Sequence, residues 1–266
     1  MLEFKHASRA SQGARPYQED SAAVWPGDST VSPSSVPPLP EGTSLIAVLA
    51  DGMGGHAGGS LASSTICGVF IESFARLGGP GEARLAPSLA AANDAIGAQV
   101  RANPALSGMG ATLVGAALGT GGLSWISVGD SPMYLFREDE LVQLNEDHSL
   151  APVIDRLVAQ GRMSAEEARN DPRRHFLRSA VTGEEIELVD APERPLSLAA
   201  GDVVLIASDG IHTLEMDDIR RIISAFCGDG PVAVAEALVR AVDAAGEPHQ
   251  DNTTVIAITV AAAAQG

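Results

Sequence analysis

Four short acidic motifs contain the residues of this chain whose types and spacing could do chemistry. The motifs are Glu19-Asp20, Asp51-Gly52, Asp209-Gly210 and Asp251-Asn252. The middle two follow the apolar runs LIAVLA and VVLIAS, which predict buried strands. An aspartate at the end of a buried strand is costly unless a cation balances its charge. Several such carboxylates with few basic neighbours therefore predict a shared site for hard cations, which prefer oxygen ligands.

The first Asp-Gly motif opens a glycine-rich segment, DGMGGHAGG, from Asp51 to Gly59. It is not a Walker A phosphate loop, because no lysine follows the glycines. It is not a dinucleotide fingerprint either, because no acidic residue is suitably placed after a second strand. Glycines let the backbone turn tightly and approach a ligand closely. The Gly52 carbonyl could therefore bind a cation beside the Asp51 carboxylate.

Composition bounds the class of protein. The 266 residues are 45% hydrophobic, show no internal repeat, and predict a single domain over residues 1–266. The formal charge of -17 leaves no basic footprint for nucleic acid. Cys67 and Cys227 have no cysteine or histidine at zinc spacing, which predicts buried free thiols in a reducing compartment. With no signal peptide and no run as long as a membrane span, we expect a cytoplasmic protein without a membrane partner.

Hydrophobic periodicity predicts the elements that position the acidic motifs. Strands are expected at 21–25, 44–50, 111–118, 123–128, 133–137, 141–144, 186–189, 202–207 and 253–260, with those from 111 to 144 forming an antiparallel meander. Helices are expected at 58–77, 83–102, 149–160, from Ser164, 215–226 and 231–245. Residues 26–43 hold a Pro- and Ser-rich stretch that predicts a surface loop between two paired strands. Clustered strands with paired helices indicate an α+β fold.

Seven motifs in order resemble the metal-dependent protein Ser/Thr phosphatases of the PP2C (PPM) type, in their bacterial form. The motifs are Arg15-Pro-Tyr-Gln-Glu-Asp20, Val48-Leu-Ala-Asp-Gly-Met-Gly-Gly-His56, Gly110-Ala-Thr-Leu-Val114, Val128-Gly-Asp-Ser131, Glu146-Asp-His-Ser149, Ala207-Ser-Asp-Gly210 and Asp251-Asn-Thr-Thr-Val255. The resemblance covers nearly the whole chain. It implies two packed antiparallel β-sheets flanked by α-helix pairs, an α-β-β-α sandwich, with a flap over residues 149–185.

The resemblance also implies a site for two Mn²⁺ or Mg²⁺ ions. Asp51 resembles the carboxylate that bridges both ions, with the Gly52 carbonyl on one of them. Asp209 and Asp251 resemble the remaining ligands of the other ion. A further set of acidic residues resembles groups that hold metal-bound waters, Glu19 and Asp20, and a ligand of a weaker third ion, Asp130.

Two residues are candidates for handling the phosphate. Arg15 stands where the family keeps its phosphate-binding arginine, and the alternative is an ordinary surface arginine. His56 either protonates the leaving oxygen, since its usual pKa suits that task, or is a loop histidine that contacts only metal-bound water. Asp130 likewise has an alternative, as the cap of a turn between two strands.

The implied reaction is hydrolysis of phosphoserine and phosphothreonine on proteins, in which a metal-bridged hydroxide attacks phosphorus. The expected partners are phosphoprotein substrates and the pathway of an opposing Ser/Thr kinase, and we expect a monomer. The alternatives are a hydrolase of small phosphoesters and an inactive regulatory module on the same fold. Pro132, Thr213 and Tyr17 depart from common family residues, which leaves substrate preference and fine geometry open.

The flap region carries a basic cluster in an otherwise acidic chain: Arg169, Arg173, Arg174 and Arg178. One interpretation is a solvated helix face. The other is a guide for acidic, phosphorylated substrate segments, with Arg173 and Arg174 reaching a protein substrate.

Overall fold

Two antiparallel sheets form the centre of the molecule in the computed structural model, which describes residues 2–27, 38–54 and 57–263. The five-stranded sheet has the order β1-β11-β10-β8-β9. Its strands are β1 (Leu2–Ser11), β8 (Met133–Arg137), β9 (Glu140–Gln143), β10 (Val203–Ala207) and β11 (Thr253–Ala262). The outer strand β1 was not predicted, because Ala7 is its one fully buried side chain and polar residues interrupt its apolar pattern.

The second sheet has four strands in the order β2-β3-β6-β7. They are β2 (Ser21–Trp25), β3 (Thr43–Ala50), β6 (Leu113–Gly119) and β7 (Gly122–Val128). The expected pairing of the first two is confirmed, with Ser21 opposite Ala50. Most of the predicted loop between them, residues 28–37, lies outside the described residues. The strands β4 (Gly52–Met53) and β5 (Gly110–Ala111) pair as a separate two-stranded ribbon.

The predicted meander from 111 to 144 is wrong in one respect. The strands β6 and β7 pair in the four-stranded sheet, whereas β8 and β9 pair in the five-stranded sheet. The chain crosses between the sheets at Gly129-Asp130-Ser131-Pro132, where Gly129 takes a positive φ of 105°. Strand periodicity gives no signal of such a crossing, since both halves alternate in the same way.

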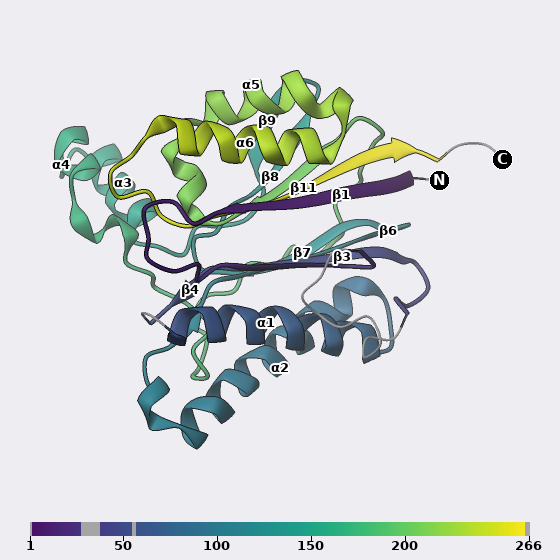
Figure 1. Ribbon diagram of the computed structural model, residues 1–266, viewed down its shortest axis with the longest axis horizontal. Helices are drawn as coiled ribbons and strands as arrows, with labels where there is room; N and C mark the ends of the chain where they lie inside the picture. Colours follow the sequence, from purple (N-terminus) through teal and green to yellow (C-terminus); the bar gives the residue numbers. More distant parts are fainter. Residues whose placement is uncertain (1, 28–37, 55–56, 264–266) are drawn as a thin grey trace.

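Helix pairs cover the outer face of each sheet, as Figure 1 shows. The helices α1 (Ala57–Arg76) and α2 (Gly81–Ala102) lie on the four-stranded sheet. The helices α5 (Met216–Phe226) and α6 (Pro231–Ala245) lie on the five-stranded sheet. Three apolar clusters fill the spaces between these four layers. The predicted α-β-β-α sandwich is therefore confirmed.

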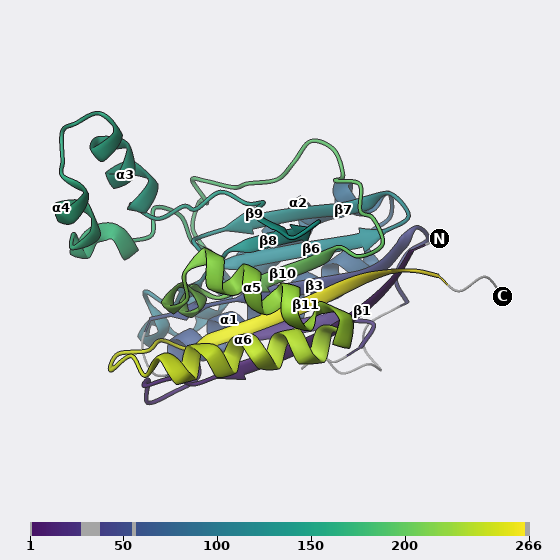
Figure 2. The same ribbon diagram turned by 90° about the horizontal axis from the view of Figure 1, so that it is seen from above.

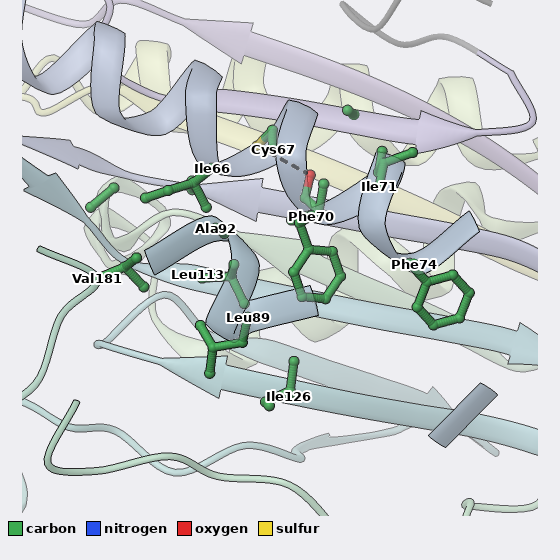
Figure 3. Close-up of a cluster of buried hydrophobic side chains, with 14 of the residues drawn as sticks. Ile66, Cys67, Phe70, Ile71, Phe74, Leu89, Ala92, Leu113, Ile126 and Val181 are labelled. Atoms are coloured by element: carbon green, nitrogen blue, oxygen red, sulfur yellow. Dashed lines mark hydrogen bonds between the residues drawn. The ribbon is translucent and has the colours of Figure 1, made fainter. Parts of the chain in front are cut away.

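Alternation along each strand divides its side chains between two clusters. In β3, Leu45, Ala47 and Leu49 face the other sheet, while the residues between them face α1 and α2. Figure 3 shows Phe70 and Phe74 projecting from α1 into the cluster between the four-stranded sheet and its two helices. A Cβ on Gly115 would lie 2.4 Å from the Phe70 ring, so this glycine makes room for the aromatic side chain. Cys67 is buried here as predicted, whereas Cys227 is only partly buried.

The flap is a helical excursion on a two-stranded stem, and Figure 2 shows it standing away from the sheets. It contains α3 (Ala151–Ala159), α4 (Ala165–Arg169) and the 3-10 helix η2 (Pro172–His175). The predicted capping box of Ser164 and Glu167 is present. In the stem, Arg178 N donates to His148 O at 2.8 Å and Leu150 N donates to Phe176 O at 3.0 Å.

Residues 186–189 do not form the predicted strand, although Ile186 and Leu188 alternate as a strand would. They run as a loop that is held by hydrogen bonds between Ser179 and Leu188. The remaining short helices are the 3-10 turns η1 (Pro104–Leu106), η3 (Asp209–Thr213) and η4 (Cys227–Asp229). Within the described ranges, no helix is long and apolar enough to cross a membrane.

Candidate metal centre

One edge of the sandwich collects the acidic motifs. Because neighbouring strands are antiparallel, the ends of β3, β7 and β10 meet the starts of β2 and β11 at this edge. Asp51 directly follows β3, Asp209 is the second residue after β10, and Asp251 is the second residue before β11. Residues that are 200 positions apart in the sequence are thus neighbours in space.

A cavity of about 780 Å³ opens at this edge. Its lining includes most of the residues predicted for the site, namely Arg15, Glu19, Asp51, Gly52, Asp130, Asp209 and Asp251. Asp20 does not line the cavity. Its side chain is buried, and its carboxylate accepts a 2.8 Å hydrogen bond from Ser208 Oγ. His56 lies outside the described residues, so both of its predicted roles stay predictions.

Burial and mutual repulsion raise the pKa values of the clustered carboxyl groups. Desolvation is the largest cause for each of them, and the charges of the neighbouring aspartates add to it, whereas hydrogen bonding, as from Ser208, partly offsets the rise for Asp20. Desolvation raises the pKa of Asp130 to about 8 and that of Asp20 to about 6. The pKa of Asp51 is raised well above its usual value, and that of Asp209 is raised as well, by burial and then by Asp251. Buried carboxylates that repel one another are a site in need of positive charge.

Three carboxylate oxygens at this edge are buried without any hydrogen-bond donor: Glu19 Oε1, Asp20 Oδ1 and Asp209 Oδ1. Acceptor oxygens without donors are the partners that Mg²⁺ and Mn²⁺ take in proteins. The donor set at this edge therefore fits hard divalent cations.

Among the residues that the structure describes, no three His, Cys, Asp or Glu side chains are grouped to hold one ion. Asp251 Oδ2 accepts a 2.5 Å bond from Arg15, whose guanidinium supplies positive charge beside this carboxylate. The ligand roles of Asp51, Asp209 and Asp251 stay predictions. Hard cations also take carbonyl and water oxygens, so fewer carboxylates per ion still fit.

The glycines of both Asp-Gly motifs are required by close backbone approach. A Cβ on Gly52 would lie 2.4 Å from the carbonyl oxygen of Glu19, and a Cβ on Gly210 would lie 2.2 Å from that of Asn252. Such distances leave no room for any other residue. The absence of a side chain lets each acidic motif pack directly against its neighbour.

Asn252 holds the N-terminal part of the site, a role that the sequence did not reveal. Its Nδ2 donates to the carbonyls of Gln12 at 2.8 Å and Tyr17 at 3.0 Å, and its Oδ1 accepts from Glu19 N at 2.8 Å. The side chain is buried. The segment that carries Arg15 and Glu19 is thereby fixed to the start of β11. The position of Asn252 beside Asp251 was the available signal.

Thr112 and His148 fix the other loops of the site, and the role of Thr112 was missed in the sequence. Thr112 Oγ1 accepts from Asp51 N at 3.0 Å and lies 2.7 Å from Ser131 Oγ. His148 Nδ1 accepts from Gly129 N at 3.2 Å, and His148 N donates to Gly129 O at 3.0 Å. Since Gly129 precedes Asp130 and His148 begins the flap stem, the flap and the Asp130 loop are joined.

The flap contributes His175, Phe176 and Arg178 to the cavity lining, but not Arg173 or Arg174. Arg173 binds Asp171 through two bonds of 2.9 and 2.6 Å, and Arg174 binds Asp155 through bonds of 2.6 and 3.2 Å. Both guanidinium groups are thus used within the flap. The predicted substrate guide of Arg173 and Arg174 stays a prediction, and their ion pairs hold η2 to its neighbours.

A sandwich of this order, with an acidic cavity at one edge, defines a class of phosphatase. The family described as protein phosphatase 2C matches residues 39–243, and the chain belongs to this family. Structures with the same fold include the Mycobacterium tuberculosis serine/threonine phosphatase PstP/Ppp, which is 31% identical with a TM-score of 0.76 over 97% of this chain and 99% of that one. The catalytic domain of PstP in complex with two manganese ions matches with the same identity and TM-score over 98% of this chain and all of that one.

Sequence relatives point to the same family. The chain is 39% identical to the serine/threonine protein phosphatase PstP of Mycobacterium tuberculosis over 183 residues, which is 66% of this chain and 33% of that protein. It is 32% identical to the protein phosphatase PhpP of Streptococcus pneumoniae over 221 residues, 80% of this chain and 85% of that one. The chain therefore spans about a third of the length of the mycobacterial relatives that it matches.

Proposed function

We propose that this chain hydrolyses phosphoserine and phosphothreonine esters on proteins at a centre for two Mn²⁺ or Mg²⁺ ions. The observation that carries the proposal is the cluster of buried, mutually repelling carboxylates that opens into one cavity beside Arg15. A neighbouring structure of the PstP catalytic domain holds two manganese ions, which supports the same use of this fold.

Each acidic residue has a proposed task toward the ions. Asp51, which lines the same cavity as Asp209 and directly precedes β4, would contact both ions. Gly52 offers its carbonyl to one ion, and Asp209 and Asp251 hold the other. Glu19 and Asp20 orient water from behind, and Asp130 serves a third ion. When bound, two such ions lower the pKa of a water and neutralise the phosphoryl oxygens.

Arg15 is proposed to bind the phosphoryl group. Its side chain is about half exposed at the mouth of the cavity, and a guanidinium is a planar, two-pronged partner for phosphate oxygens. Its bond to Asp251 shows that it can reach the carboxylate cluster. With Asp251 turned toward an ion, Arg15 becomes available to the substrate.

The decisive experiment is a phosphatase assay with and without Mn²⁺ on a phosphopeptide and on p-nitrophenyl phosphate. We expect both to be hydrolysed with Mn²⁺ and neither after chelation, because oxygen ligands hold these ions only moderately. Undiminished turnover after thorough EDTA treatment and dialysis would refute the metal mechanism. Activity on small phosphoesters alone would favour a hydrolase of small phosphoesters. No activity on either substrate would favour an inactive regulatory module.

The remaining expectations are part of the same proposal. We propose that residues 1–266 act as one domain, that the protein is a monomer, and that it opposes a Ser/Thr kinase in the cytoplasm. The continuous apolar clusters between all four layers support the single domain. Size-exclusion chromatography with light scattering tests the monomer.

A further inference from the structure

One wall of the cavity is a loop that the family motifs do not include. Residues 179–188 leave the flap stem and return to β7 through a bridge between Asp190 and Ser127. Five residues of this loop line the cavity: Ser179, Ala180, Thr182, Glu185 and Glu187. The loop therefore borders the place where a phosphorylated segment must lie if Arg15 binds its phosphate.

The loop is anchored at both ends and in the middle. Ser179 Oγ donates to Leu188 O at 2.9 Å and accepts from Leu188 N at 3.0 Å, which closes its base. Val181 pairs with Ala111 of β5. Figure 3 shows Val181 beside the apolar cluster under α1 and α2. A loop fixed in this way presents its side chains in one arrangement before any ligand arrives.

The tip of the loop is clamped to α2. Asn93 Oδ1 accepts from Gly183 N at 2.8 Å, and Asn93 Nδ2 donates to Glu184 O at 2.7 Å. Gly183 takes a φ of +86°, and a Cβ there would lie 2.4 Å from the Cα of Gly97. This close contact sets the direction of the residues that follow, which include Glu185 and Glu187.

Glu185 and Glu187 are exposed carboxylates without an ion pair. None of the ion pairs formed among the described residues involves Glu185, Glu187 or Arg178. In the same cavity Asp209 Oδ1 is buried without a donor, which marks the inner end of the cavity as a place for a cation. Two carboxylates on a fixed loop beside a phosphate site are suited to a cationic side chain.

We propose that Glu185 and Glu187 recognise a basic residue close to the phosphorylated serine or threonine, so that the preferred substrates are phosphosegments flanked by arginine or lysine. This inference rests on the proposed function and names its substrate class. The two divalent ions and Arg15 balance the phosphate and the inner carboxylates, which leaves the pair on the loop to attract the flanking residue.

Arg178 is the competing group, because it lines the cavity and would favour an acidic flank. It is a single charge against two, and it lies in the flap stem directly before the anchored loop, where its backbone N donates to His148 O. The balance of charges at the rim therefore favours basic substrates.

The test compares phosphothreonine peptides that carry arginine, alanine or glutamate at each position within three residues of the phosphothreonine. In the wild-type enzyme with Mn²⁺, arginine at the matching position should raise kcat/KM about three- to fivefold over alanine, the effect of an exposed ion pair. This preference should fade as salt rises, because the charges are solvent-accessible. The ratio is taken within each variant, so differences in the amount of active enzyme cancel.

The double variant Glu185→Gln with Glu187→Gln should lose the preference for arginine, and Glu185→Lys with Glu187→Lys should shift it to glutamate. Glu184→Gln is the matched control, since this neighbouring carboxylate is exposed and is not part of the cavity lining, and it should keep the wild-type ratio. A wild-type ratio of one, a preference for glutamate, or an arginine preference that survives in both double variants overturns the inference. If neither a phosphopeptide nor p-nitrophenyl phosphate is hydrolysed with Mn²⁺, the proposed function itself has failed.

Discussion

The carboxylates of Asp209 and Asp251 differ in their burial and in their hydrogen-bond partners. Asp209 has a buried oxygen without a donor, whereas Asp251 has a side chain that is 38% exposed and bonded to Arg15. Both belong to the proposed ligand set. Loss of a ligand charge weakens the ion and raises the pKa of its water.

We expect Asp209→Asn and Asp251→Asn each to lower kcat at saturating Mn²⁺ by about 100-fold or more, while the fold survives. Asp243→Asn is the control, because Asp243 lies on α6 and only accepts a bond from Ser11 Oγ. Steady-state rates and melting curves measure both effects. A variant that keeps near wild-type kcat shows that its ligand assignment is wrong.

Arg15 is expected to act on binding more than on turnover. Arg15→Ala should raise KM for a phosphopeptide and weaken inhibition by inorganic phosphate, since it removes binding present in the ground state as well. Arg9→Ala serves as control, because Arg9 pairs with Glu236 on α6. An unchanged KM with a large loss of kcat would show that Arg15 binds the phosphoryl group only in the transition state.

At the scale of elements, Asn252 makes three of the hydrogen bonds that hold the segment before β2. Asn252→Ala removes three hydrogen bonds and leaves Glu19 N without its acceptor. We expect a loss of roughly 2–4 kcal/mol in the free energy of unfolding, from buried groups left unpaired. Urea denaturation in EDTA measures it. Asn103→Ala, which removes an exposed cap of η1, should cost about 1 kcal/mol, and equal losses would count against a special role for Asn252.

The flap is held by contacts of its own. Arg174 joins η2 to α3 through Asp155, whose side chain is 59% exposed, so the pair contributes at most about 1 kcal/mol. Arg174→Ala should make the flap a few-fold more sensitive to limited proteolysis while turnover of p-nitrophenyl phosphate stays near the wild-type rate. Cleavage sites are located by mass spectrometry. A large loss of turnover would show that Arg174 acts in the active site.

Local signals predicted some elements well and others not at all. The bounds of α6 follow from Pro231 in its first turn and Gly246 in the left-handed conformation after its end. The acidic motifs were visible because an aspartate after an apolar run is unusual. Asn252, Thr112 and the loop 179–188 act through distant partners, and Ile186 and Leu188 imitate a strand. Such roles depend on tertiary contacts, which periodicity does not carry.

At the scale of the whole molecule, the acidic edge links stability to pH. An unfolded aspartate has a pKa near 3.8, whereas burial raises that of Asp130 to about 8. The folded protein therefore holds this proton more tightly, and its stability falls as pH rises toward 8. Burial lowers the pKa values of His148 and His212 below 6.5, so their opposite effect lies at lower pH.

In EDTA we expect the melting temperature to fall between pH 6.5 and pH 8. Mn²⁺ should restore it, and the shift should be larger at pH 8, where the ion replaces protons that have left. Differential scanning calorimetry of the wild type and of Asp130→Asn, whose pH dependence should be flatter, gives the comparison. A melting temperature that rises over this range without metal would contradict the linkage.

The pairing of β1 with β11 has a consequence for how the protein is made. Leu2 lies opposite Ala262 and Ser11 opposite Thr253, so the first strand has no neighbour in its sheet until the last one exists. The free ends of both strands lie at the end of the molecule away from α3 and α4 (Figure 1). Asp251 and Asn252 also arrive just before that final strand. On the ribosome, a nascent chain can build the four-stranded layer early, but β1 must wait until β11 has been made, and closing so long a loop is slow. The acidic edge should therefore be completed only after β11 has left the ribosome and paired with β1.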